Sequence, residues 1–407
     1  MKQLRTLYVC YFGLREPLVQ TQVLPYLREL AAAGIEVHLL TFEPRLQSSW
    51  DPETRNVLQS QLTAEGIKWS ALAYHKRPSL PATLYDIANG ACQIVRLVRL
   101  NRIDVLHARA HIPMAMALIA ARITRCRLVF DIRGLMAEEY ADAGVWAEKS
   151  LKFRAIKLLE QTGIRKADQI VVLTRAMREW LRESRLAAVE KIEVIPCCVD
   201  FTRYAAPENG ADVETDKFEV VYAGSVIGLY LLEEMAAFFI ALRAQEPRAF
   251  LRILTTSLRE EAAARLRSAG VAPNDFWVGG VSANEVPGYL RRAGLGLSFR
   301  KSTFSQLAAS PTKIPEYLAA GLPVVSNAGI GDVDVLLESE RVGVVVHNFT
   351  AAEFESVAGR ALQLVADGGV RIRCVEVARR HFDVKTIGAN GYANVYRRIA
   401  QEERDRA

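Results

Sequence analysis

The sequence predicts an α/β protein with two doubly wound domains, each built on a parallel sheet. The chain opens with a buried strand at residues 4–10, a loop, an amphipathic helix over Pro17–Ala33 and a second strand at residues 35–42. The same alternation starts again at Phe218, after a polar segment that contains Pro and Gly. With 407 residues, half of them hydrophobic, the chain is large enough to form two cores.

The change of composition after Pro196 sets the predicted domain boundaries. We expect a first domain at residues 1–196, a linker at 197–217, a second domain at 218–382 and a helical tail at 383–407. The second domain therefore repeats the architecture of the first, and the chain does not form one large sheet.

Charge and cysteine content restrict the class of partner and the compartment. The net charge of +6 and the pI near 9.0 are too mild and dispersed for nucleic-acid binding, but they suit a nucleotide diphosphate or an acidic membrane surface. Six cysteines without zinc-type spacing indicate a reducing compartment. The sequence has no run of about 20 apolar residues, the length that a membrane-spanning helix needs. We expect no secretory leader, because the short apolar run after residue 5 does not resemble a secretory h-region. We expect a cytoplasmic protein, peripheral to the inner face of a membrane.

Candidate ligand-binding residues, polar at two strand ends and a glycine at a third, follow three strands of the first predicted sheet, where a doubly wound fold binds its ligands. Arginines there can clamp a phosphate or carboxylate, and a His or Asp can bind sugar hydroxyls or move a proton. The alternative is a structural ion pair between Asp131 and Arg133, with histidines that only fill space. The residues in question are Gly13 after the first strand, His107, Arg109 and His111 after another, and Asp131 and Arg133 after the next.

In the second domain, Ser310–Gly321 has the pattern of a helix followed by a buried strand. Ser310 is the expected N-cap, Pro311 the first helical residue, and Gly321 the stop. Lys313 and Glu316 are three residues apart, so they share a face near the helix start, which suits a phosphate. An ordinary surface ion pair is the competing interpretation. Farther upstream, the turn at Gly224 and Ser225 follows a strand and allows close approach of a phosphate to the backbone.

The Ser310–Gly321 stretch with its following Pro-Val-Val resembles the nucleotide-sugar-binding helix of retaining glycosyltransferases of the group 1 type. Residues 130–146 resemble a subgroup of that family associated with polysaccharide biosynthesis, through Asp-x-Arg-Gly, paired acidic residues and Asp-Ala-Gly-x-Trp. The segment Ile195–Asp200 is similar to the family's hinge. The resemblance implies the GT-B fold, with two Rossmann-like domains facing a central cleft and a C-terminal helix that returns to the first domain.

The resemblance also implies roles for individual residues. Glu316 would hold the donor ribose, and backbone groups near Val278 and Gly279 would bind the nucleotide base. The family's Arg and Lys shortly after the glycine turn are missing here, so Lys313, or Arg300 and Lys301, would replace them. The expected phosphate contacts are Gly224, Ser225, Arg300, Thr312 and Lys313. A second family Glu, eight positions before Glu316, is replaced by Ala308, which leaves Gln306 as a substitute sugar contact.

The predicted function is transfer of a hexose or related sugar from a nucleotide-diphosphate sugar to a glycan or lipid-linked acceptor, with retention, in cell-envelope or exopolysaccharide biosynthesis. Neither a cofactor nor an obligatory metal is expected. His107, Asp131 and Arg133 are the predicted catalytic residues, and the predicted acceptor side consists of Gly13, Arg109, His111 and Glu138. Two alternatives remain at this point, a nucleotide-sugar epimerase of the same fold and a non-catalytic relative that binds nucleotide sugars.

Overall fold

The computed structural model describes residues 3–46, 50–75, 77–204 and 216–406, with backbone alone for 403–406. The chain forms two compact units. The first unit contains Met1–Ala137, Trp146–Pro196 and Val384–Ala407, and the second contains Glu138–Val145 and Cys197–Asp383.

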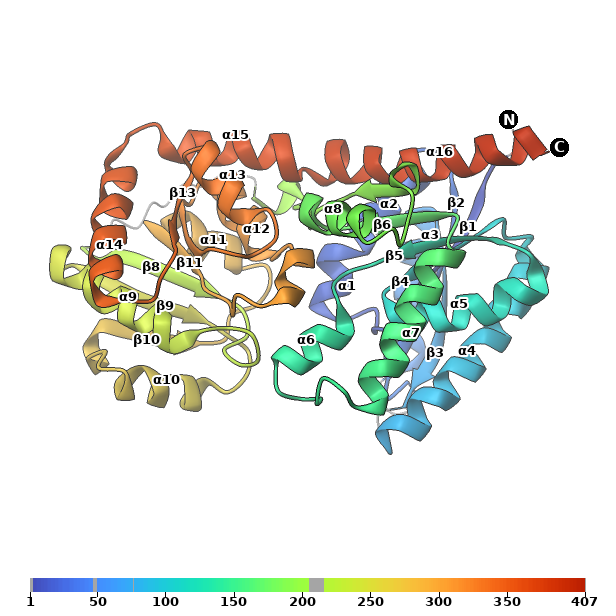
Figure 1. The fold of residues 1–407 in the computed structure, drawn as a ribbon, viewed down its shortest axis with the longest axis horizontal. Coiled ribbons are helices and arrows are strands. Elements are labelled where there is room, and N and C mark those ends of the chain that lie inside the picture. The colour runs from blue at the N-terminus through green and yellow to red at the C-terminus, as the bar shows by residue number, and fades with distance from the viewer. Residues whose placement is uncertain (1–2, 47–49, 76, 205–215, 407) are drawn as a thin grey trace. The chain divides into compact units, whose positions relative to one another are not determined.

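Within the described residues, the first unit is built on a seven-stranded sheet whose order is β3-β2-β1-β4-β5-β6-β7 (Figure 1). All neighbouring strands are parallel. The central strands are buried on both faces, as continuous apolar runs predict for a sheet covered by helices. The strands are β1 (Arg5–Cys10), β2 (Glu36–Pro44), β3 (Ile67–Tyr74), β4 (Val105–Arg109), β5 (Arg127–Asp131), β6 (Gln169–Val172) and β7 (Ile192–Val194).

The helices of this unit follow the strands in the βαβ manner. The helices α4, α5 and α7 pack side by side, and α2 packs against the C-terminal helix α16. Their bounds are α1 (Pro17–Gln22), α2 (Leu24–Ala32), α3 (Pro52–Ala64), α4 (Ser79–Asn101), α5 (His111–Thr124), α7 (Leu151–Lys166), α8 (Arg175–Glu183) and α16 (Ala389–Arg406); the short helix α6 (Met136–Asp142) begins in the first unit and ends in the second.

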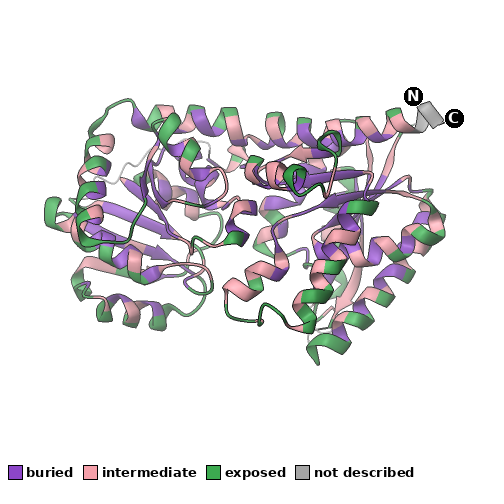
Figure 2. Cartoon of the chain, in the orientation of Figure 1, coloured by how far each residue is buried: buried purple, intermediate pink, exposed green. Residues whose placement is uncertain are grey.

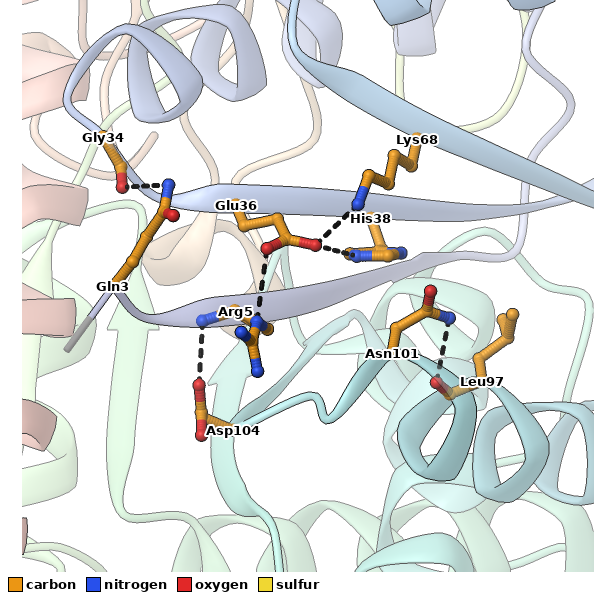
Figure 3. Close-up of polar contacts among 9 residues, drawn as sticks. All are labelled: Gln3, Arg5, Gly34, Glu36, His38, Lys68, Leu97, Asn101 and Asp104. Atoms are coloured by element: carbon orange, nitrogen blue, oxygen red, sulfur yellow. Dashed lines mark hydrogen bonds and ion pairs between the residues drawn. The ribbon is translucent and has the colours of Figure 1, made fainter.

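A polar network joins the amino ends of β1, β2 and β3, the edge opposite to the one where a doubly wound sheet binds ligands (Figure 3). Glu36 accepts from Lys68 Nζ at 2.7 Å and from Arg5 Nε at 3.2 Å, and it contacts the His38 ring at 3.0 Å. Hydrogen bonds from Lys68 and His38 lower the pKa of Glu36 to about 2. We assign this network to stability because it lies at the amino edge of the sheet.

In its described part, the second unit is built on a six-stranded parallel sheet with the order β10-β9-β8-β11-β12-β13. The sheet therefore repeats the strand order of the first one without its last strand. Its strands are β8 (Phe218–Ala223), β9 (Ala249–Leu254), β10 (Phe276–Gly279), β11 (Leu295–Ser298), β12 (Val324–Asn327) and β13 (Gly343–Val346).

Two hydrophobic clusters form the core of the second unit. One includes Phe238, Phe239 and Phe299, and the other includes Tyr317 and Leu322. Burial of these large side chains is the main favourable term in folding of the unit. Figure 2 shows the buried strands within shells of exposed helix surface. The helices are α9 (Leu232–Gln245), α10 (Arg259–Ser268), α11 (Val286–Arg292), α12 (Lys313–Ala319), α13 (Val333–Ser339), α14 (Ala351–Ala366) and α15 (Val370–Phe382).

The predicted fold class, two parallel-sheet α/β domains, is confirmed. Several local expectations differ from the structure. The helix expected over Pro17–Ala33 is divided at Val23, because Pro25 lacks the amide hydrogen that would continue α1 and instead lies in the first turn of α2. Residues 135–146 contain the short helix α6, and residues 138–145 group with the second unit although the sequence predicted them to be in the first domain. Most of the expected linker, residues 205–215, lies outside the described residues.

Candidate functional site

The strongest candidate site lies at the carboxyl ends of β8 and β11 in the second unit. These strands are neighbours in the sheet, but the chain proceeds from them in opposite directions, to β9 on one side and to β12 on the other. Such a switch point leaves a crevice outside the strand ends, where open α/β sheets bind ligands.

Lys313 places a buried cation at this switch point. Its side chain belongs to the first residue of α12 and is only 5% exposed. The Nζ atom lies 4.2 Å from the ring centroid of Tyr230 and 5.0 Å from that of Tyr222. No carboxylate in the described residues lies within 4 Å of it, and burial lowers its pKa. A buried cation without an anionic partner is costly, so it is suited to receive an anionic ligand.

Arg300 is the second cation of this site and follows directly after β11. A short antiparallel bridge joins Arg300 to Tyr230, and the Arg300 guanidinium lies 5.1 Å from the Tyr230 ring centroid. Its Nε atom is buried and has no hydrogen-bond partner in the described part of the chain. The neighbouring Lys301 is engaged, since it donates to the carbonyl oxygen of Asp142. Of the two basic residues at the end of β11, Arg300 is therefore the one with a donor left for a ligand.

The side chain of Tyr230 joins the two cations. Lys313 chiefly, and also Arg300, lower the pKa of the Tyr230 hydroxyl. Tyr230 was not predicted to belong to the site, because the residue type expected after the glycine turn was a base. The bridge between Tyr230 and Arg300 could not be read from the sequence, since the two residues are 70 positions apart.

The glycine turn after β8 lies against Lys313. Gly224 is exposed and has a φ of 141°, a conformation that residues with a side chain rarely adopt. A Cβ atom at this position would lie 3.4 Å from Lys313 Nζ, the atom that faces the turn. The adjacent Ser225 accepts a hydrogen bond at its hydroxyl from the amide of Ile227. The turn and the cation thus lie against each other, and their predicted role in phosphate binding stays a prediction.

Glu316 lies one helical turn after Lys313. Its carboxylate is 3.8 Å from the Arg203 guanidinium, which belongs to a 3-10 turn, Phe201–Tyr204, after the linker's first residues. Burial raises the pKa of Glu316, although Arg203 and Lys313 partly offset the effect. The side chain keeps 19% of its surface exposed. It can therefore still accept hydrogen bonds from a ligand, and its neighbour Arg203 was not predicted from the sequence.

Val278 and Gly279 lie at the carboxyl end of β10, the edge strand of the sheet. The carbonyl oxygen of Gly279 accepts a hydrogen bond from the Thr255 amide at 2.9 Å, so this carbonyl group is used in the hydrogen bonding of the sheet. Two strand spacings separate these residues from Gly224, a distance of about 10 Å.

The local prediction for the start of α12 was wrong. The helix begins at Lys313 with Thr312 as N-cap residue, and no side chain caps it. Ser310, the expected N-cap, accepts a hydrogen bond from the Cys197 amide at 3.1 Å instead. Gln306, the substitute sugar contact, is completely buried, and its side-chain oxygen has no partner in the part of the chain described here.

The three residues predicted to be catalytic gather around Asp131 in the first unit. Asp131 Oδ2 accepts from the Tyr392 hydroxyl at 2.9 Å and lies 3.7 Å from both His107 Nε2 and Arg109 Nη1, while Arg133 is 3.5 Å from Oδ1. Burial would raise the pKa of Asp131, but Arg133 and the other partners hold it below its usual range.

Both Asp131 and His107 have no exposed surface. His107 Nδ1 contacts the Tyr396 hydroxyl at 2.8 Å, and burial lowers the pKa of His107. The ion pair of Asp131 and Arg133, weighed at the outset as a structural alternative, is present. Because Tyr392 and Tyr396 belong to α16, the cluster also attaches the C-terminal helix to this sheet. A direct catalytic role for these residues stays a prediction.

The predicted acceptor-side residues each have different neighbours in the structure, and their role in acceptor binding stays a prediction. His111 is buried and paired with Glu160 at 2.9 Å. Gly13 lies over the buried carboxylate of Glu43, where an added Cβ would come within 2.8 Å of Glu43 Oε2. Arg109 is part of the Asp131 cluster, and Glu138 lies on α6 within the second unit.

Within the described residues, no group of three or more His, Cys, Asp or Glu side chains could hold a metal ion. None of the described helices is both long enough and apolar enough to cross a membrane.

Comparison with known proteins identifies the class of this fold. Residues 19–198 match the family model of the glycosyl transferase 4-like domain. None of the curated protein sequences compared with this chain matches it.

Solved structures resemble the whole chain. HepE from Anabaena, in complex with UDP and glucose, is 16% identical with a TM-score of 0.67, over 97% of this chain and 99% of its own. Sucrose-phosphate synthase from Thermosynechococcus elongatus is 15% identical with a TM-score of 0.72, over 98% and 100%. A protein assigned as UDP-N-acetylglucosamine 2-epimerase from Listeria monocytogenes is 12% identical with a TM-score of 0.58, over 96% and 94%. The chain therefore has the GT-B fold, and its residues 19–198 match a glycosyl transferase 4-like domain.

Proposed function

We propose that the protein is a glycosyltransferase that moves a hexose or related sugar from a nucleotide-diphosphate sugar to a glycan or lipid-linked acceptor. The reaction would proceed with retention, without an obligatory metal, in cell-envelope or exopolysaccharide biosynthesis. The similarity to HepE, whose structure contains UDP and glucose, favours a UDP-sugar as donor.

One observation carries the proposal. Lys313 and Arg300 meet at the switch point of the second sheet, and no carboxylate in the described residues pairs with either of them. A diphosphate is the ligand that two such cations and a glycine turn would accommodate. The two groups replace the basic pair that the family resemblance expects after Gly224.

The distances support a nucleotide bound across the sheet edge. The distance from the glycine turn to Val278 is about 10 Å, which is roughly the distance between the diphosphate and the base of a nucleotide. Glu316, in the same helix as Lys313, would accept hydrogen bonds from the two hydroxyls of the ribose, which lies between the diphosphate and the base. A Glu carboxylate accepts such a pair of bonds best when it is ionised.

Catalysis would then rest on positioning and on stabilising the charge of the departing diphosphate. Lys313 and Arg300 act where negative charge develops, in a site that burial keeps low in dielectric. The Tyr230 hydroxyl, whose pKa these cations lower, can donate to the same oxygens. For the first unit we propose acceptor binding, with Asp131, His107 and Arg133 retained as candidate catalytic groups.

The proposal is tested by incubating the protein with a panel of nucleotide-diphosphate sugars and cell-envelope lipids or glycans, and measuring nucleotide release and glycosylated product. We expect one donor to give an acceptor-dependent product and the Lys313→Met variant to give none. A protein that binds UDP but gives no product with any acceptor would be a non-catalytic binding protein.

An epimerase is the second candidate, because an epimerase structure shares the fold at a lower TM-score. Epimerisation needs no acceptor. If the donor alone yields an isomeric sugar, followed by NMR, the epimerase assignment replaces the transferase one.

A further inference from the structure

Three neighbouring helices of the first unit, α4, α5 and α7, present one continuous solvent face. The helix α4 packs against α5, and α5 packs against α7 (Figure 1). The structure describes every residue of the three helices. We call their exposed side chains the basic face.

The basic face carries cations and no exposed carboxylate among these helical residues. The two acidic residues of the three helices, Asp86 and Glu160, are fully buried. Asp86 is bonded to Tyr11 and His75, and Glu160 to His111 and Lys157. The exposed basic residues are Arg96, Arg99, Arg122, Lys152, Arg154, Arg165 and Lys166.

Other helices of the same unit do not share this pattern. On α8, Arg182 pairs with both Glu179 and Glu183 at the surface. On α3, Glu53 and Arg55 are both exposed. The missing acidic charge on the basic face is therefore local and does not follow from the mild net charge of the chain.

Large apolar side chains are interspersed with these cations. Leu151 is 83% exposed and Leu100 is 68% exposed, which is costly in water unless something covers them. A nucleic acid or an acidic protein would use the cations alone, whereas a bilayer accepts both kinds of side chain. The exposed apolar residues of the face are Leu80, Leu84, Tyr85, Leu100, Ile119, Ile123, Leu151 and Leu158.

We propose that the basic face docks the protein on an anionic lipid bilayer. Its cations lie at the headgroups, and its Leu, Ile and Tyr side chains enter the boundary with the acyl chains. This attachment goes beyond the proposed transfer reaction and does not depend on it, because the face lies on helices and contains no residue of the candidate donor site.

The test measures co-sedimentation of the full chain with vesicles. One set of vesicles contains phosphatidylcholine with about a quarter phosphatidylglycerol, and the other contains phosphatidylcholine only. We expect binding to the anionic vesicles, weakened by added salt, and little binding to the neutral ones.

Two variants distinguish the contribution of the basic face to vesicle binding from the contribution of the protein's net charge. The first combines Arg99→Glu, Arg122→Glu and Lys166→Glu. The matched control makes the same charge change elsewhere, with Arg55→Glu, Arg267→Glu and Arg397→Glu, which are exposed residues outside the face. We expect at least a hundredfold loss of vesicle binding in the first variant and less than about tenfold in the control.

A further variant, Leu151→Ser with Leu158→Ser, keeps every charge and removes exposed apolar surface. Reduced vesicle binding with an unchanged melting temperature supports insertion. Equal losses in the face variant and the control would overturn the proposal. So would absence of vesicle binding together with binding to tRNA that is sensitive to the face variant, because the face would then be a nucleic-acid surface.

Discussion

Replacing Lys313 by Met should stabilise the free protein and remove its affinity for a diphosphate. The side chain is almost fully buried, and its Nζ atom contacts the rings of Tyr222 and Tyr230. In the absence of ligand its charge is desolvated and not paired with a carboxylate among the described residues. Methionine has a similar length and no charge, so it can occupy the same space.

The expected magnitudes follow from opposing terms. Burying a cation costs several kcal/mol, and two cation–π contacts return about 1–2 kcal/mol each at most. A net gain of about 1 kcal/mol on removing the charge would raise the melting temperature by about 2–4 °C in domains of this size. A charge-assisted bond to phosphate is worth about 1.5–3 kcal/mol, which corresponds to a loss of about 10- to 150-fold in UDP affinity.

The assay is thermal unfolding with and without UDP, together with calorimetric titration. Lys301→Met is the control, since Lys301 carries the same charge nearby but bonds to a carbonyl oxygen. We expect the control to bind UDP within about threefold of the original protein, because a screened surface charge contributes little. A Lys313→Met protein that is less stable and binds UDP normally would refute the account of this site.

Three further predictions concern stability. Gly13→Ala should destabilise the protein by about 1–3 kcal/mol, since the new methyl group would collide with Glu43 and Pro44; an unchanged denaturation midpoint would contradict the placement of this loop. Asp131→Asn should cost about 3–5 kcal/mol because it removes the carboxylate that lies 3.7 Å from the buried Arg109, and a neutral effect would show that the cluster is solvated. Glu36→Gln should cost about 1 kcal/mol or less at neutral pH, because the group reaches solvent. The Glu36 pKa is lowered, so this contribution is complete above pH 4.5 and disappears as the pH falls toward 2; a difference between the two proteins that persists at pH 2 would contradict the assignment.

The strands and the doubly wound order could be predicted because they are encoded locally. A buried strand such as β1 is a continuous apolar run. Gly34, which has a positive φ, follows the end of α2 and precedes β2. The contact of Lys313 with the turn at Gly224 was also predictable, since both positions follow from the βαβ pattern. The break at Val23 was visible in principle through Pro25.

Long-range contacts were the part that the sequence did not reveal. Tyr230 enters the donor site through a bridge to Arg300, and Arg203 reaches Glu316 from a turn more than 100 residues earlier. The burial of His107 depends on α16, whose Tyr396 covers it from the other end of the chain. Such contacts leave no periodic signal, because each joins segments that are adjacent only in the folded chain.

The direct test of the donor site compares the affinities of UDP and 2′,3′-dideoxy-UDP for the original protein and for Glu316→Gln. If Glu316 binds the ribose diol, removing the two hydroxyls lowers the affinity of the original protein by about 10- to 150-fold, which corresponds to about 1.5–3 kcal/mol. The same removal should have little effect on the Glu316→Gln variant. If the variant distinguishes the two nucleotides as strongly as the original protein does, the ribose lies elsewhere and the proposed site is wrong.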